Sequence, residues 1–129
     1  MIYGIGTDLC RVERMEHCLA RPAFVQRVFA PAEQQLLDSR RGKARLETAA
    51  ANFAAKEAFL KACGTGLAGY ALQEIAVLRR PGGAPYLQCS GRAADFLTEQ
   101  GLAAHLSLTH EAGLAAAFVV LEFRTAADD

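Results

Sequence analysis

One uninterrupted stretch of helix-forming residues constrains this chain more than any other feature. Between about Leu46 and Cys63 the sequence contains neither glycine nor proline and is rich in alanine. Such a stretch favours a long helix, and Gly64 supplies the residue type that ends helices in the left-handed conformation. We therefore expect a helix over 46–63 that forms the spine of the fold.

Shorter elements are predicted on both sides of this spine. They are a strand over 1–9, helices over 11–19, 23–29 and 32–39, strands over 74–78 and 86–89, a helix over 91–99, and strands over 106–109 and 114–123. Because residues 114–121 are apolar at successive positions, we expect the last strand to be central and covered on both faces. Helices followed by strand pairs predict the α+β class, with a long central helix packed on an antiparallel sheet.

The first predicted strand has one bare face. Gly4 and Gly6 share that face with Asp8 by the two-residue period of a strand, so we expect another segment to approach closely there. Asp8 stands where this strand gives way to a helix, and an N-cap is an equally simple interpretation of that residue.

Length and composition predict one domain with a thin core. The chain has 129 residues, which fits a single domain over 1–129. Although 52% of the residues are hydrophobic, 26 are alanine and none is tryptophan, so little apolar area is available per residue. We therefore expect part of the stability to come from association with further copies of the chain.

Charge and cysteine content exclude several classes of function. The formal net charge is +0, which argues against a general nucleic-acid binder. Residues 1–61 nevertheless carry ten basic and seven acidic side chains, so this half could face an acidic partner, although the densest basic patch, 40–45, is typical of a solvated loop. The four cysteines form no C-x-x-C pair and no apolar run is long enough to span a membrane, which predicts a reduced, cytoplasmic protein without membrane contact.

The predicted spine helix carries a candidate site. Glu57 and Lys61 lie four residues apart and therefore share a face, which from spacing alone favours a simple surface ion pair. Together with Asp8, however, they suggest a metal-phosphate site, because Mg²⁺ binds carboxylate oxygens and phosphates while an ammonium neutralises phosphoryl charge. Gly64-Thr65-Gly66 could approach phosphates with backbone amides. His110, at a strand end, could bind a substrate phosphate or simply cap a hairpin, and the second interpretation is favoured without further information.

The order of these motifs resembles one family over nearly the whole chain. The motifs are Ile5-Gly6-Thr7-Asp8, Phe29-x-Pro31-x-Glu33, Phe53-x-x-Lys56-Glu57-x-x-x-Lys61, Gly64-Thr65-Gly66 and Ser107-x-Thr109-His110. In this order they are similar to the holo-acyl-carrier-protein synthases, which have the 4′-phosphopantetheinyl transferase fold. The length matches the small branch of that superfamily rather than the branch that resembles two fused units.

The resemblance implies a function and a set of site residues. It implies transfer of 4′-phosphopantetheine from coenzyme A to a serine of apo acyl carrier protein, a step of fatty acid biosynthesis, with adenosine 3′,5′-bisphosphate as the other product. Asp8 and Glu57 would hold Mg²⁺ and act in catalysis with Lys61. Lys56, Gly64, Thr65, Gly66 and His110 would bind coenzyme A, and Arg14 would face the acidic carrier. The family also implies a homotrimer with active sites at subunit boundaries.

Two departures from the family pattern leave alternatives open. Asn52 and Ala84 stand where similar sequences often carry arginine and lysine, so both remove positive charge and put the phosphate contacts in question. The same carboxylates and lysine could instead direct water in a magnesium-dependent hydrolase of nucleotide pyrophosphates. A third interpretation is a non-catalytic module that binds coenzyme A or carrier protein.

Overall fold

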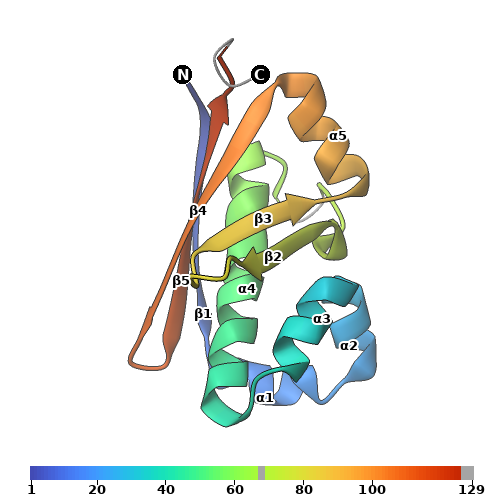
Figure 1. Cartoon of the computed structure of the whole chain (residues 1–129), viewed down its shortest axis with the longest axis vertical. Helices are drawn as coiled ribbons and strands as arrows, with labels where there is room; N and C mark the ends of the chain where they lie inside the picture. Colours follow the sequence, from blue (N-terminus) through green and yellow to red (C-terminus); the bar gives the residue numbers. More distant parts are fainter. Residues whose placement is uncertain (67–68, 126–129) are drawn as a thin grey trace.

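A long helix, α4, runs through the middle of the molecule, with a three-stranded sheet on one side and shorter elements on the other (Figure 1). This computed structural model describes residues 1–66 and 69–125. The elements are β1 (Ile2–Arg11), α1 (Arg14–Leu19), α2 (Pro22–Val28), α3 (Pro31–Asp38), α4 (Gly42–Cys63), the 3-10 helix η2 (Leu72–Glu74), β2 (Ile75–Arg79), β3 (Pro85–Cys89), α5 (Gly91–Gln100), β4 (Leu102–Glu111) and β5 (Leu114–Phe123). The predicted α+β class is confirmed.

The larger sheet has the strand order β1-β5-β4, and both pairings are antiparallel. β2 and β3 form a separate two-stranded sheet. The prediction that the last strand is central is therefore confirmed. The prediction that it is covered on both faces is wrong for the single chain, because Ala117 and Val119 are buried whereas Phe118 between them is 52% exposed.

The helix α4 packs on the sheet through small residues. Gly4 and Gly6 of β1 face it, and a Cβ atom added to Gly6 would overlap the carbonyl oxygen of Ala58, while one added to Gly4 would overlap that of Ala62. This confirms the expected close approach to the bare strand face, and only glycine permits it. The helix ends where predicted, at Gly64, which has a left-handed backbone with φ of 84°.

The opposite face of the larger sheet exposes large apolar side chains. Ile5 and Leu9 of β1 are 65% and 64% exposed, and Leu114 and Phe118 of β5 are 41% and 52% exposed. The strand register places Thr7 beside Phe118 and Arg11 beside Leu114, so the four apolar side chains share one surface. We call Ile5, Leu9, Leu114 and Phe118 the open sheet face. Contiguous exposed apolar surface of this kind is typical of a contact with another molecule.

Several predicted boundaries are shifted. α4 starts at Gly42 rather than near Leu46, β1 continues through Arg11, and β4 spans Leu102–Glu111. Asp8 is thus inside a strand and does not cap a helix, and His110 is part of β4 rather than of the turn. Among the described residues, no helix combines the length and the apolar character needed to cross a membrane.

Candidate functional site

Asp8, Glu57 and Lys61 meet where β1 crosses α4. Nζ of Lys61 lies 3.1 Å from Oδ1 of Asp8 and also donates a hydrogen bond of 3.0 Å to the carbonyl oxygen of Thr7. Lys61 therefore forms its ion pair with Asp8 of β1. The spacing alone favours an ion pair with Glu57 instead. The Asp8 side chain is 16% exposed and that of Lys61 is 54% exposed, so the site is open to solvent on the lysine side.

The glycines of β1 explain why these groups come together. Because Gly6 allows the backbone of α4 to lie against the strand, Asp8, two residues further along the same strand face, is brought beside the next turn of the helix. Glu57 and Lys61 project from successive turns of α4 on that flank. The packing of β1 on α4 thus brings the strand carboxylate of Asp8 close to the helix carboxylate of Glu57, as the sequence predicts.

The pKa of Glu57 is raised above its usual value. Burial raises the pKa of its carboxyl group, and the negative charge of Asp8 raises it further, while Arg14 and Lys61 oppose these effects. Perturbed carboxylates that face a second carboxylate are typical of functional sites. The influence of Arg14 also places that residue near the site, where its guanidinium lies 4.9 Å from the centre of the Phe53 ring.

The donor set fits a hard divalent cation that is also bound by other oxygen ligands. Asp8 and Glu57 supply two carboxylates, and their mutual repulsion is a cost that a cation between them would remove. In the described part of the chain there is no group of three or more His, Cys, Asp and Glu side chains suited to a metal. Two carboxylates with water and substrate oxygens suit Mg²⁺, which keeps several waters, better than they suit zinc.

Gly64, Thr65 and Gly66 follow α4 directly and are exposed. The hydroxyl of Thr65 donates to the carbonyl oxygen of Gly66 at 3.3 Å, and Gly66 has a positive φ of 65°. These residues begin about one helical turn after Lys61. Their contact with coenzyme A stays a prediction.

Lys56 does not lie where the prediction requires. Its side chain is fully buried and forms an ion pair with Glu33 of α3, while it also donates to the carbonyl oxygens of Leu72 and Ile75. All three ammonium hydrogens are therefore engaged inside the protein. Burial lowers the pKa of Lys56, and the Glu33 carboxylate opposes that change. We correct the assignment accordingly: this lysine joins α4 to α3 and β2 and has no surface with which to contact coenzyme A.

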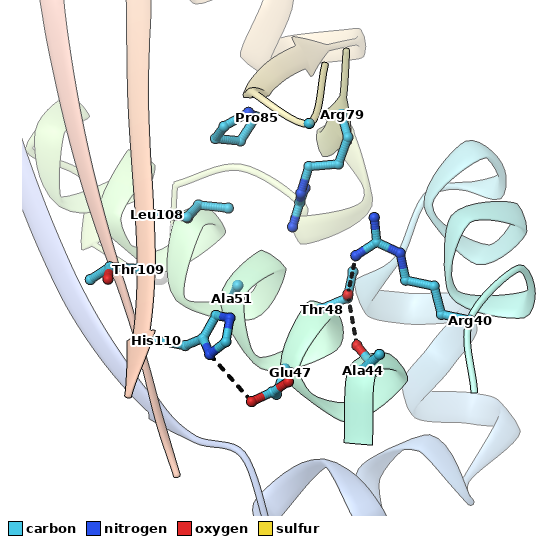
Figure 2. Close-up of a pocket in the computed structure, with 11 residues that line it drawn as sticks. Arg40, Ala44, Glu47, Thr48, Ala51, Arg79, Pro85, Leu108, Thr109 and His110 are labelled. Carbon is cyan, nitrogen blue, oxygen red and sulfur yellow. Dashed lines mark hydrogen bonds and ion pairs between the residues drawn. The ribbon is translucent and has the colours of Figure 1, made fainter. Parts of the chain in front are cut away.

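His110 lines a pocket on the other flank of α4 (Figure 2). Nδ1 of His110 lies 3.2 Å from Oε2 of Glu47. The pocket has a volume of about 290 Å³. It is lined by residues of α4, β2, β3, β4 and the loops beside them, namely Arg40, Ala44, Glu47, Thr48, Ala51, Arg79, Gly83, Pro85, Leu108, Thr109 and His110. The structure thus places His110 in a basic cavity, where it could bind an anion.

Sequence reasoning missed the two arginines of this pocket. Arg40 belongs to the basic patch at 40–45, whose composition is typical of a solvated loop, and Arg79 is part of no motif in the sequence. Their guanidinium groups point into the same pocket from different elements (Figure 2). The only available signal was the local density of basic residues before α4, which does not indicate where their side chains point.

Comparison with known proteins shows the family to which this chain belongs. A family model described as the 4′-phosphopantetheinyl transferase superfamily matches residues 4–119. The chain belongs to this superfamily. Membership confirms the resemblance predicted from the motifs, and it confirms that the chain is a transferase.

Individual members of the transferase superfamily match over almost their full length. The holo-[acyl-carrier-protein] synthase of Trichlorobacter lovleyi is 48% identical over 126 residues, covering 95% of this chain and 98% of that protein. A crystal structure of the Bacillus anthracis synthase in complex with CoA (3′,5′-ADP) has a TM-score of 0.82 at 34% identity, covering 96% of this chain and 99% of the other. The Neisseria meningitidis synthase has a TM-score of 0.84 at 33% identity, covering 95% and 99%.

Proposed function

We propose that this protein transfers 4′-phosphopantetheine from coenzyme A to a serine of apo acyl carrier protein, giving holo acyl carrier protein and adenosine 3′,5′-bisphosphate. The observation that carries the proposal is the meeting of Asp8, Glu57 and Lys61 at the contact of β1 with α4 in a member of the transferase superfamily. Residues 1–129 form a single phosphopantetheinyl transferase domain, acting in the cytoplasm.

Asp8 and Glu57 are the residues that would hold Mg²⁺. When bound, the ion supplies positive charge that polarises the diphosphate of coenzyme A. Lys61 contributes a second positive charge from the protein, because its half-exposed ammonium can turn from Asp8 toward a phosphoryl oxygen. Positioning and charge neutralisation account for most of the rate enhancement in phosphoryl transfer, and these side chains supply both.

Arg14 is the residue that receives the carrier protein. It is exposed at the start of α1, and its influence on Glu57 places it beside the acidic site. A carrier serine must reach the reacting phosphate, so a residue that binds the acidic carrier has to lie next to that site. The excess of basic residues in the first half of the chain is consistent with an acidic partner.

The acidic site (Asp8, Glu57 and Lys61) and the basic pocket lined by His110 lie on opposite flanks of α4. Thr48, which lines the basic pocket, and Glu57 are about two and a half helical turns apart and therefore point in opposite directions. Asp8 is on β1 and His110 on β4, at the two edges of the larger sheet. A coenzyme A molecule that uses both kinds of site therefore binds the acidic site of one copy and the basic pocket of another.

A homotrimer with active sites at its subunit boundaries meets this requirement. The open sheet face offers apolar surface that a single chain leaves in water. Burial of this face between copies also supplies the apolar area that the alanine-rich core lacks.

We expect Phe118→Arg to convert the protein to monomers, because a guanidinium in the centre of the open sheet face cannot be buried without a partner. Analytical ultracentrifugation measures the mass, and the transfer rate should fall by at least about tenfold as the composite sites are lost. Gln26→Arg on exposed α2 is the matched control. A trimeric, fully active Phe118→Arg protein would contradict the assembly.

The function itself is tested by incubating the protein with coenzyme A, Mg²⁺ and apo carrier protein. We expect the intact mass of the carrier to increase by one phosphopantetheine group, with release of adenosine 3′,5′-bisphosphate. Cleavage of coenzyme A without a change in carrier mass would instead indicate a pyrophosphate hydrolase. Binding without cleavage would indicate a non-catalytic module.

A further inference from the structure

The guanidinium group of Arg14 rests on the face of an aromatic ring. Its Cζ atom lies 4.9 Å from the centre of the Phe53 ring, which is within the range of a favourable cation–π contact. Arg14 begins α1 and is exposed, whereas Phe53 belongs to α4 and is only 6% exposed. A buried ring of the long helix thus supports an exposed arginine of another element.

The same arginine lies beside the acidic site. Phe53 and Glu57 are four residues apart and therefore lie one turn apart on one face of α4. The positive charge of Arg14 lowers the pKa of Glu57, and this effect is larger than that of Lys61. Arg14 is therefore within electrostatic reach of Glu57 while its guanidinium contacts Phe53.

Arg14 and Glu57 nevertheless do not form an ion pair. Within residues 1–66 and 69–125, no ion pair or side-chain hydrogen bond engages the Arg14 guanidinium or the Glu57 carboxylate. Glu57 would gain from such a pair, because burial and the charge of Asp8 both raise its pKa. The contact with Phe53 keeps the guanidinium in another place and leaves its N–H donors for a different partner.

Two further rings fix the orientation of Phe53. The ring of Phe24 on α2 stacks on it, with the ring centres 6.0 Å apart and an interplanar angle of 30°. Phe24 in turn meets Phe29 edge to face, with the ring centres 6.1 Å apart. All three rings are buried. Because closely packed core side chains cannot turn freely, Phe53 is a rigid support for the exposed arginine.

We propose that Phe53 is a positioning residue that holds the Arg14 guanidinium away from Glu57 and leaves it directed toward the carrier protein. The inference rests on the proposed function, in which Arg14 binds the acidic carrier and Glu57 would hold Mg²⁺. These two roles conflict unless the groups are kept apart, since an ion pair between them would engage both charges. The face of an aromatic ring attracts a guanidinium without neutralising it, which meets this requirement.

The first test measures the affinity for the carrier by isothermal titration calorimetry, using an apo carrier whose acceptor serine is replaced by alanine. Phe53→Leu removes the ring face but keeps an apolar side chain, and it should weaken carrier binding about two- to fivefold. Phe53→Tyr keeps the ring face and should retain the wild-type affinity. Arg14→Lys should also weaken binding, because an ammonium stacks on a ring less well than a planar guanidinium. Combining Arg14→Lys with Phe53→Leu should add little, since both changes remove the same contact.

A second measurement detects the ion pair that the ring prevents. In Phe53→Leu the released guanidinium should bind Glu57 and compete with Mg²⁺, which lowers the affinity for Mg²⁺ in the presence of coenzyme A by up to about fivefold. Adding Arg14→Gln should restore the affinity for Mg²⁺, because the competing charge is gone, but should not restore carrier binding. A general structural defect would not be corrected by the loss of a second side chain.

Phe24→Leu is the matched control. It removes a ring from the same cluster, but the ring beneath Arg14 is that of Phe53. This variant should unfold at a lower temperature, as Phe53→Leu should, and should keep the wild-type affinities for the carrier and for Mg²⁺. If Phe53→Leu proves too unstable to study, Arg14→Lys makes the carrier comparison without a change in the core.

The outcomes separate this inference from the function on which it rests. Suppose that the wild-type protein modifies the carrier, but Phe53→Leu binds it no more weakly than Phe24→Leu does, or Phe53→Tyr binds it as weakly as Phe53→Leu. The positioning role is then wrong while the function stands. If the wild-type protein neither binds nor modifies the carrier, the proposed function itself is wrong.

Discussion

Glu57→Gln should lower the rate of phosphopantetheine transfer by at least 10²- to 10³-fold, on the order of what the loss of one charge-stabilising group costs in other enzymes. Glutamine keeps the size and the hydrogen-bonding capacity of the side chain but removes the charge that, with Asp8, would hold Mg²⁺. Carrier mass measured against time gives the rate, and calorimetric titration with Mg²⁺ in the presence of coenzyme A gives an independent readout of metal affinity.

The stability of the same variant distinguishes a functional from a structural role. Because burial and Asp8 raise the pKa of Glu57 in the folded protein, the ionised side chain destabilises the fold at neutral pH. Neutral glutamine should therefore unfold at the same or a higher temperature than the wild-type protein. Glu99→Gln, at an exposed position of α5, should change neither activity nor stability. An active Glu57→Gln protein would remove Glu57 from the reaction.

The sequence predicts the spine of the fold well because its signals are local. Alanine-rich helical sequence and the terminal Gly64 both act within a few residues, and the structure confirms them. The start of α4 was missed because it lies at a glycine, and the next three residues contain two basic side chains and no large apolar one. The uncovered face of β5 could not be predicted either, since a run of apolar residues does not reveal whether its second face is covered by the same chain or by another copy.

The sequence likewise predicts only part of the candidate site. Asp8, Glu57 and Lys61 could be named from spacing and from the resemblance, whereas the partner of Lys61 depends on how β1 meets α4. Asn52 stands where similar sequences often carry arginine. The positive charge in the pocket comes instead from Arg79, which is 27 positions away in sequence and donates a hydrogen bond to Asn52. No short-range pattern indicates such a replacement, because it depends on the pairing of β2 beside the helix.

Lys56 is the clearest case in which a motif residue has a structural role. It belongs to the same run as Glu57 and Lys61, but helical geometry turns it away from them and into the interior. Its partner Glu33 is 23 positions away in sequence, on α3. Burial of both charges is tolerated because each is hydrogen-bonded, with Glu33 also accepting from the backbone N–H of Ala30 and from Asn52.

Lys56→Met should therefore destabilise the protein by about 3–5 kcal/mol, because it leaves the Glu33 carboxylate buried without a counter-charge. The free energy of unfolding is measured by urea titration, with Lys43→Met at an exposed position of α4 as the matched control. Glu33→Gln in the Lys56→Met background should restore part of the loss, because the buried charge is gone while an amide still replaces the carboxylate. Full recovery is not expected, since the carbonyl oxygens of Leu72 and Ile75 lose their donor. A Lys56→Met protein of normal stability with weakened coenzyme A binding would return this residue to the ligand site and overturn the structural assignment.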